Sequence, residues 1–97
     1  MRRAPRRIEL ATAFRRDMRR ENRGLYRRQV QALVDRVVAV LAVDASLPQA
    51  NRDHPLTGTW SGYRECHVRP DLLLVYRKPD GDRLQLARLG SHSELFS

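Results

Sequence analysis

The sequence predicts an α+β domain in which an N-terminal hairpin of two helices packs on a small antiparallel sheet of about four strands. Two patterns support this fold class. Apolar residues repeat at helical spacing between about residues 11 and 44, and three short strand-like runs follow between residues 63 and 89. The chain has 97 residues, of which 41% are apolar, so we expect residues 1–97 to form a single domain.

The first helix is predicted to follow a short strand at residues 6–10, where polar and apolar side chains alternate. Phe14 and Met18 then fall on one helical face, opposite a face rich in arginine. Asn22 and Gly24 are expected to end this helix, because glycine readily adopts the left-handed conformation common at helix ends.

The second helix is predicted from about residue 25 to residue 44. Because the link between the helices is short, they should form an antiparallel hairpin whose apolar side covers the sheet. The apolar stripe of this second helix consists of Tyr26, Val30, Leu33, Val37 and Leu41.

The second half of the chain carries the remaining strands. Residues 72–77 are apolar on both faces and are therefore expected to form the central strand, and PDGD at 79–82 predicts a hairpin turn. SHSELF near the C-terminus predicts one short helical turn capped by Ser91 or Ser93. The three predicted strands are residues 63–69, 72–77 and 83–89.

Positive charge is concentrated at the N-terminal end. Residues 1–28 contain eleven arginines and three acidic side chains, whereas the rest of the chain is balanced. Such a block is typical of nucleic-acid binding, and the planar guanidinium suits phosphate; the alternative is a solvated helix face. The candidate RNA-binding arginines are Arg15, Arg16, Arg19, Arg20 and Arg23.

Cysteine content and hydropathy indicate a soluble cytoplasmic protein. The single Cys66 excludes an internal disulfide and a CxxC-type zinc site, which fits a reducing compartment. No segment approaches the roughly 20 apolar residues of a membrane span, and the N-terminus MRRAPRR lacks the apolar run of a signal peptide. We therefore expect no membrane association.

The strand at residues 63–69 separates polar from apolar side chains. With a period of two, Glu65, His67 and Arg69 point one way, and Cys66 and Val68 point toward the helices. Cys66 is therefore expected to pack as a small hydrophobic residue rather than act as a reactive thiol.

All three histidines lie in the last 44 residues, each beside a carboxylate or a serine. Imidazole changes charge near neutral pH, and two proton-transfer groups with a nearby cation suit RNA cleavage by 2′-hydroxyl attack. The alternative is an interaction module with incidental histidines. A metal site built from His54, His67 and His92 is disfavoured, because none of the usual metal-ligand spacings occurs.

The stretch DHPLTGTWSGYRECHVRPDLLLVYR, followed by LARLGSHSELF, resembles the YafQ branch of the RelE-type toxins of bacterial toxin–antitoxin pairs. The resemblance covers nearly the whole chain. It implies a RelE-like fold and a ribosome-dependent endoribonuclease that cuts mRNA in the ribosomal A site and arrests growth by inhibiting translation. It implies no cofactor and no metal.

The resemblance also assigns site residues. The family's functional histidines fall on His54, His67 and His92, its aspartate after proline on Asp71, and its C-terminal phenylalanine on Phe96, expected to contact RNA by stacking or else to pack internally. The sequence departs from the family pattern at two positions. Glu65 replaces an aspartate, and Leu72 replaces an aromatic residue, which puts base stacking there in doubt.

By this resemblance His67, oriented by Asp71 and Glu65, would act on the 2′-hydroxyl, and His92 would protonate the leaving oxygen, although these two roles are interchangeable. His54 would position the phosphate, with Arg88 as an oxyanion partner. The implied partners are the ribosome with its mRNA and a cognate antitoxin. The antitoxin would be acidic and partly disordered when free. The protein would bind operator DNA only as part of its complex with the antitoxin. Two rivals remain: a non-catalytic basic nucleic-acid-binding protein, and a degenerate toxin acting only as an antitoxin-binding co-repressor.

Overall fold

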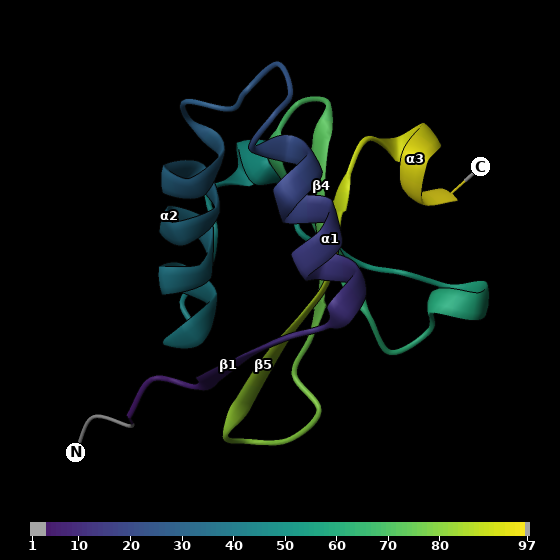
Figure 1. Ribbon diagram of the computed structural model, residues 1–97. Coiled ribbons are helices and arrows are strands. Elements are labelled where there is room, and N and C mark those ends of the chain that lie inside the picture. Colours follow the sequence, from purple (N-terminus) through teal and green to yellow (C-terminus); the bar gives the residue numbers. More distant parts are fainter. Residues whose placement is uncertain (1–3, 97) are drawn as a thin grey trace.

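The computed structural model describes residues 4–96 and has the α+β architecture expected from the sequence (Figure 1). Within residues 4–96, no helix has the length and apolar character needed to cross a bilayer. The elements in chain order are β1 (Arg7–Leu10), α1 (Thr12–Glu21), α2 (Val30–Ala42), the 3₁₀ turn η1 (Gln49–Asn51), β2 (His54–Pro55), the 3₁₀ turn η2 (Gly58–Trp60), β3 (Arg64–Arg69), β4 (Leu72–Arg77), β5 (Arg83–Gly90) and α3 (His92–Phe96).

The sheet has five strands in the order β1-β5-β4-β3-β2 and is mixed, not wholly antiparallel as predicted. β3, β4 and β5 form an antiparallel meander with β4 at the centre, as expected, whereas β1 runs parallel to β5. The direction of β1 is not encoded by a local turn, because its partner strand lies more than 70 residues away. The fifth strand, β2, is two residues long and pairs with the β3 edge.

The main core lies between the sheet and the two long helices, which cover the same face (Figure 1). Cys66 is fully buried there, as predicted for the apolar side of β3. Burial raises the pKa of its thiol to about 12, so the thiol stays protonated at neutral pH. Leu72 is also buried in this core, so its position serves packing rather than base stacking.

The α1–α2 connector, residues 22–29, differs from the prediction. α2 begins at Val30 rather than near residue 25, and a chain of turn hydrogen bonds spans the connector. Leu25 is 81% exposed, so no packing favours an extra helical turn there. The expected left-handed glycine is also wrong, since the positive-φ glycines are Gly58 and Gly62, whereas Gly24 has no positive φ.

A smaller core covers the opposite face of β4. Leu73 and Val75 point to this side and pack with Leu95 of α3. Trp60 and Phe96 close the cluster from the η2 turn and from α3. Both faces of β4 are therefore buried, and α3 is fixed against the sheet beside the β3–β4 turn.

Candidate active site

An open hollow of about 470 Å³ lies where β3, the β3–β4 turn and the start of α3 meet. It brings together His67 and His92, which are 25 residues apart in the sequence, with the carboxylates of Glu65 and Asp71. The lining residues are Glu65, His67, Pro70, Asp71, Leu73, Ser91, His92 and Ser93.

His67 is oriented by the turn that follows its strand. Its Nδ1 lies 3.2 Å from the carbonyl oxygen of Pro70. Because a carbonyl only accepts hydrogen bonds, Nδ1 must carry the hydrogen in this contact. A neutral His67 ring therefore has its lone pair on Nε2, which is the arrangement required of a general base.

His54 contacts the hollow through Glu65. The pairing of β2 with β3 places the two residues opposite each other, and His54 Nε2 lies 3.1 Å from Glu65 Oε2. His54 Nδ1 lies 3.1 Å from the Pro55 carbonyl oxygen. The Pro55 carbonyl only accepts, so this contact requires a hydrogen on Nδ1, and a protonated His54 would pair with the Glu65 carboxylate. Glu65 is only 6% exposed, and the imidazole of His54 lies against its carboxylate.

The short strand β2 is anchored by the residue before it. Asp53 accepts a hydrogen bond of 2.6 Å from the Tyr76 hydroxyl and pairs with Arg64 at 3.2 Å. Burial and the Asp53 carboxylate raise the pKa of Tyr76, which therefore remains a neutral donor. Asp53 thus fixes the backbone from which His54 extends to Glu65.

His92 begins α3, and a capping box sets the geometry of this helix. The Ser91 N–H donates to Glu94 Oε1 at 2.8 Å, and the Glu94 N–H donates to the Ser91 hydroxyl at 3.2 Å. The Ser91 N–H, together with the nearby Arg20 guanidinium, holds the pKa of Glu94 below its usual value. The predicted cap at Ser91 is confirmed.

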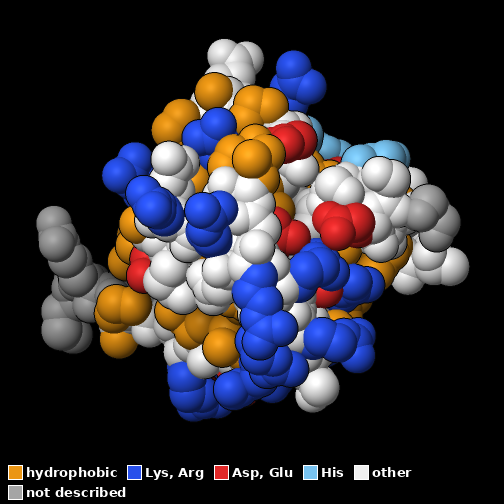
Figure 2. All heavy atoms as spheres, turned by 45° about the horizontal axis from the view of Figure 1, so that its top comes forward, with side chains coloured by type: hydrophobic (Ala, Val, Ile, Leu, Met, Phe, Trp, Pro, Cys, Tyr) orange, Lys and Arg blue, Asp and Glu red, His pale blue; other side chains and the backbone are white. Residues whose placement is uncertain are grey.

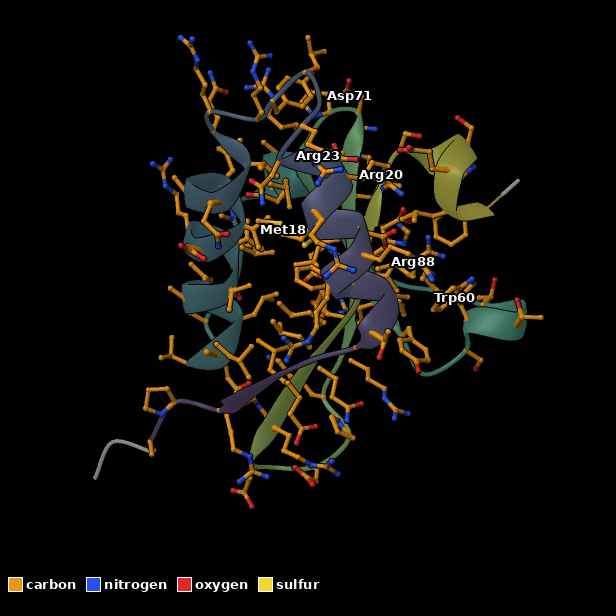
Figure 3. The ribbon with its side chains drawn as sticks, viewed as in Figure 1. Met18, Arg20, Arg23, Trp60, Asp71 and Arg88 are labelled. Carbon is orange, nitrogen blue, oxygen red and sulfur yellow. The ribbon has the colours of Figure 1, made fainter. Side chains whose placement is uncertain are left out.

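Arg88, predicted to support the phosphate, does not line the hollow. Its Nε lies 2.7 Å and its Nη2 3.2 Å from the carboxylate oxygens of Asp17, which is 1% exposed. Burial alone would raise the pKa of Asp17, but hydrogen bonds from Arg88 and the Leu89 N–H, with the Arg20 charge, lower it. In Figure 3, Arg88 and Arg20 lie along the flank of α1, and Asp71 lies nearer the upper end of the sheet.

The predicted RNA-binding arginines divide into two groups. Arg20 is exposed but is engaged in an intramolecular network: its Nη2 donates to the Leu89 carbonyl at 2.8 Å, and it pairs with Asp17, Glu21 and Glu94. Figure 2 shows Lys and Arg side chains spread over one face, with histidine side chains at the border of that face. Four other predicted arginines are exposed, and their side chains make no hydrogen bond or ion pair among residues 4–96: Arg15, Arg16, Arg19 and Arg23.

Phe96 takes part in an aromatic cluster behind the hollow. Its ring centroid lies 6.2 Å from that of Trp60 and 5.2 Å from that of His92. Trp60 meets Tyr63 edge-to-face at 5.1 Å. Phe96 is half-buried, so it backs the His92 ring while part of its face stays accessible.

A bulge in β3 changes the predicted direction of Arg69. The pairing with β4 shifts after His67, and Arg69 lies opposite Leu72, whose side chain is in the main core. Arg69 therefore turns away from the side of His67. Among residues 4–96, no three His, Cys, Asp or Glu side chains are placed to hold a metal ion together.

A small basic α+β domain, with imidazoles and carboxylates around one hollow, is the kind of protein found among bacterial toxins of toxin–antitoxin pairs. The family model described as the bacterial toxin of type II toxin–antitoxin systems, YafQ, matches residues 6–97. The chain therefore belongs to the YafQ toxin family.

Individual relatives agree with this assignment. The mRNA interferase toxin YafQ of Escherichia coli K12 is 48% identical over 50 residues, which are 52% of this chain and 53% of that protein. The chain thus spans about half the length of the curated relatives it matches. YafQ in the E. coli DinJ–YafQ toxin–antitoxin complex has 32% identity and a TM-score of 0.82, covering 97% of this chain and 100% of that one.

A copper-bound mutant toxin from Helicobacter pylori is similar as well. It has 36% identity and a TM-score of 0.81, covering 96% of this chain and 100% of that one. These likenesses confirm the expected toxin family and the expected RelE-like fold class.

Proposed function

We propose that this protein is an mRNA interferase that cuts mRNA in the ribosomal A site by 2′-hydroxyl attack and is neutralised by a cognate antitoxin. The observation that carries the proposal is the meeting of His67, His92 and Asp71 around one open hollow. The E. coli K12 relative is named as an mRNA interferase, which supports the same reaction class.

The first step is deprotonation of the 2′-hydroxyl. His67 is the better base, because its Nδ1–H faces the Pro70 carbonyl and leaves the Nε2 lone pair for the substrate. The freed oxygen attacks the adjacent phosphorus. The Asp71 and Glu65 carboxylates, which line the same hollow, favour the imidazolium that forms on His67.

The second step is departure of the 5′-oxygen. As the P–O5′ bond breaks, His92 donates a proton to O5′, leaving a 2′,3′-cyclic phosphate and a free 5′-hydroxyl. When protonated, His54, which lies 3.1 Å from Glu65, adds positive charge for the pentavalent phosphorane. Arg88 is given no such role, because its guanidinium is bound to Asp17.

Binding to ribosomal RNA falls to the exposed arginines. Arg15, Arg16, Arg19 and Arg23 lie on α1 and the start of the connector, and all are free to meet phosphates. Each phosphate contact releases counterions, so the affinity should fall steeply with salt. We place the reaction in the cytoplasm, where translating ribosomes are found.

An antitoxin segment has a suitable surface on the helical side. A groove of about 380 Å³ runs between β1, α1 and α2, and Arg15 and Arg19 lie at its polar rim. Phe14, Val34 and Val38 form part of its apolar floor. An amphipathic segment with acidic flanks fits this chemistry, and the E. coli relative is found in a complex with the antitoxin DinJ.

The decisive experiment adds the purified protein to ribosomes carrying labelled mRNA and maps the cut ends. His67→Ala and His92→Ala should each slow cleavage by about 10²–10⁴-fold, the usual contribution of a general acid or base. The control variant Asp35→Ala, which alters an exposed side chain on α2, should cleave mRNA at the wild-type rate. Products without a 2′,3′-cyclic phosphate would disprove the mechanism.

The rival reading, a non-catalytic basic binding protein, makes the opposite prediction. It requires growth arrest to survive His67→Ala and His92→Ala but to disappear in Arg16→Ala/Arg19→Ala. Intact mRNA during arrest would favour this reading.

A further inference from the structure

The hydroxyl of Tyr26 donates a hydrogen bond to the Asp71 carboxylate, lying 2.9 Å from Oδ1 and 3.0 Å from Oδ2. Tyr26 belongs to the α1–α2 connector, and Asp71 lies 45 residues further on, in the β3–β4 turn. Within residues 4–96, Tyr26 supplies the only hydrogen bonds to the Asp71 side chain. A residue outside the hollow therefore orients one of its carboxylates.

Tyr26 is itself held firmly. The Arg69 guanidinium lies 4.4 Å from the centre of its ring, on the side to which the β3 bulge turns that arginine. The Tyr26 carbonyl accepts hydrogen bonds from the N–H groups of Gln29 and Val30 at 2.8 and 2.9 Å, where α2 begins. Both the ring and the backbone of Tyr26 are thus fixed before its hydroxyl meets Asp71.

Asp71 needs such a partner because it is exposed and lies between two hollows. The second hollow, of about 250 Å³, shares Asp71 and Ser91 with the first and is otherwise bordered by α1, the connector, the start of β4 and α3. An unrestrained carboxylate can rotate toward either hollow or toward water. A hydrogen bond from a fixed tyrosine selects one orientation.

We infer that Tyr26 is a positioning residue for the cleavage reaction, holding Asp71 in the orientation in which it serves the hollow of His67 and His92. This inference rests on the proposed function. Tyr26 touches no reacting atom and acts only through Asp71.

The test compares two tyrosines in matched surroundings. Tyr26→Phe removes the hydroxyl and keeps the ring under Arg69. Tyr63→Phe is the control. The Arg77 guanidinium lies 5.2 Å from the centre of the Tyr63 ring, as Arg69 lies over Tyr26, but the Tyr63 hydroxyl does not contact Asp71. Single-turnover cleavage of ribosome-bound mRNA gives the maximal rate and the half-saturating protein concentration, and a melting curve monitors folding.

Tyr26→Phe should lower the maximal rate by about tenfold, the loss expected for a hydrogen bond to a charged group, without changing half-saturation. Tyr26→His, which keeps an aromatic N–H donor, should recover part of the rate. In the background of Asp71→Ala, which is itself slow, Tyr26→Phe should cause no further loss, because the group on which it acts is gone.

Four results would overturn the inference. If Tyr26→Phe cleaves at the wild-type rate while Asp71→Ala is slow, the proposed function stands and only the role of Tyr26 is disproved. An equal loss in Tyr63→Phe, or an additive loss in the double variant, would show a general structural effect. A full rate for Asp71→Ala would instead count against the proposed site itself.

Discussion

The Asp17 carboxylate of α1 accepts the backbone N–H of Leu89 in β5 at 3.0 Å. Three residues further along the same helix, Arg20 donates to the Leu89 carbonyl at 2.8 Å. β1 pairs with β5 only as far as Leu86, so beyond that point the edge of β5 would otherwise be unpaired. Two side chains of a helix therefore replace the missing strand and fix β5 just before His92.

Asp17→Ala should destabilise the fold strongly. It leaves the Arg88 guanidinium and the Leu89 N–H without their carboxylate in a buried site. Breaking a buried pair of this kind costs about 3–5 kcal/mol. Urea unfolding should show this loss, whereas Asp35→Ala, at an exposed site, should stay within about 0.5 kcal/mol of wild type. A loss below 1 kcal/mol for Asp17→Ala would contradict the assigned role.

Acid should unfold the protein through carboxylates whose pKa is depressed. The Arg6 and Lys78 contacts lower the pKa of Asp44 to about 2, and the pKa of Asp17 is lowered as well. A group whose native pKa lies below its unfolded value stabilises the fold above the unfolded pKa. Stability should therefore be constant down to about pH 4 and fall between pH 4 and about pH 2. Chemical denaturation across this range measures the fall, and Asp17→Asn should flatten it.

The arginines of α1 should separate into binding and structural residues. Arg15→Ala/Arg16→Ala should leave the melting temperature unchanged. It should also weaken the salt dependence of RNA binding: the slope of the logarithm of the binding constant against the logarithm of the salt concentration should become shallower by about 0.7 for each lost phosphate contact. Arg20→Ala should instead lower the free energy of unfolding by about 1–2 kcal/mol, because buried acceptors lose their donor. A lower melting temperature for Arg15→Ala/Arg16→Ala, with no loss of stability for Arg20→Ala, would contradict both assignments.

Local patterns predicted most of the fold. β4 is central because its residues are apolar on both faces, and Ser91 caps α3 because Glu94 lies three positions on. The meeting of His67 and His92 also follows from the predicted strand order, since β3 and the end of β5 flank β4. These features depend on short-range periodicity and on turns that the sequence marks clearly.

The features that sequence patterns missed depend on long-range contacts. Asp17 was not among the predicted core or site residues, although its spacing of three from Phe14 places it on the buried side of α1. Arg69 was given the wrong face because nothing in the sequence marks the bulge after His67. Tyr26 was assigned to a helical stripe, since its partner Asp71 lies 45 residues away.

Cys66 should report unfolding. Its thiol is fully buried with a pKa of about 12, so almost no thiolate is present or accessible at pH 8. A thiol reagent such as dithionitrobenzoate should modify Cys66 of the native protein only as fast as the fold opens. In denaturing urea the same reagent should modify Cys66 at once. Rapid stoichiometric labelling of native protein would show that β3 is open to solvent.

The contact between His54 and Glu65 predicts that one substitution will affect the cleavage rate and the binding of the ribosome differently. Glu65→Gln removes the carboxylate that favours a protonated His54 during the reaction, so the maximal rate of ribosome-dependent cleavage should fall by about tenfold. The same change deletes a negative charge beside the phosphate site, so half-saturation should occur at an equal or lower protein concentration. In a His54→Ala background, Glu65→Gln should slow the reaction by much less, since the pair is already broken. Single-turnover assays of the four proteins complete this cycle. An unchanged rate for Glu65→Gln, or fully additive losses, would mean that His54 does not act through this pair.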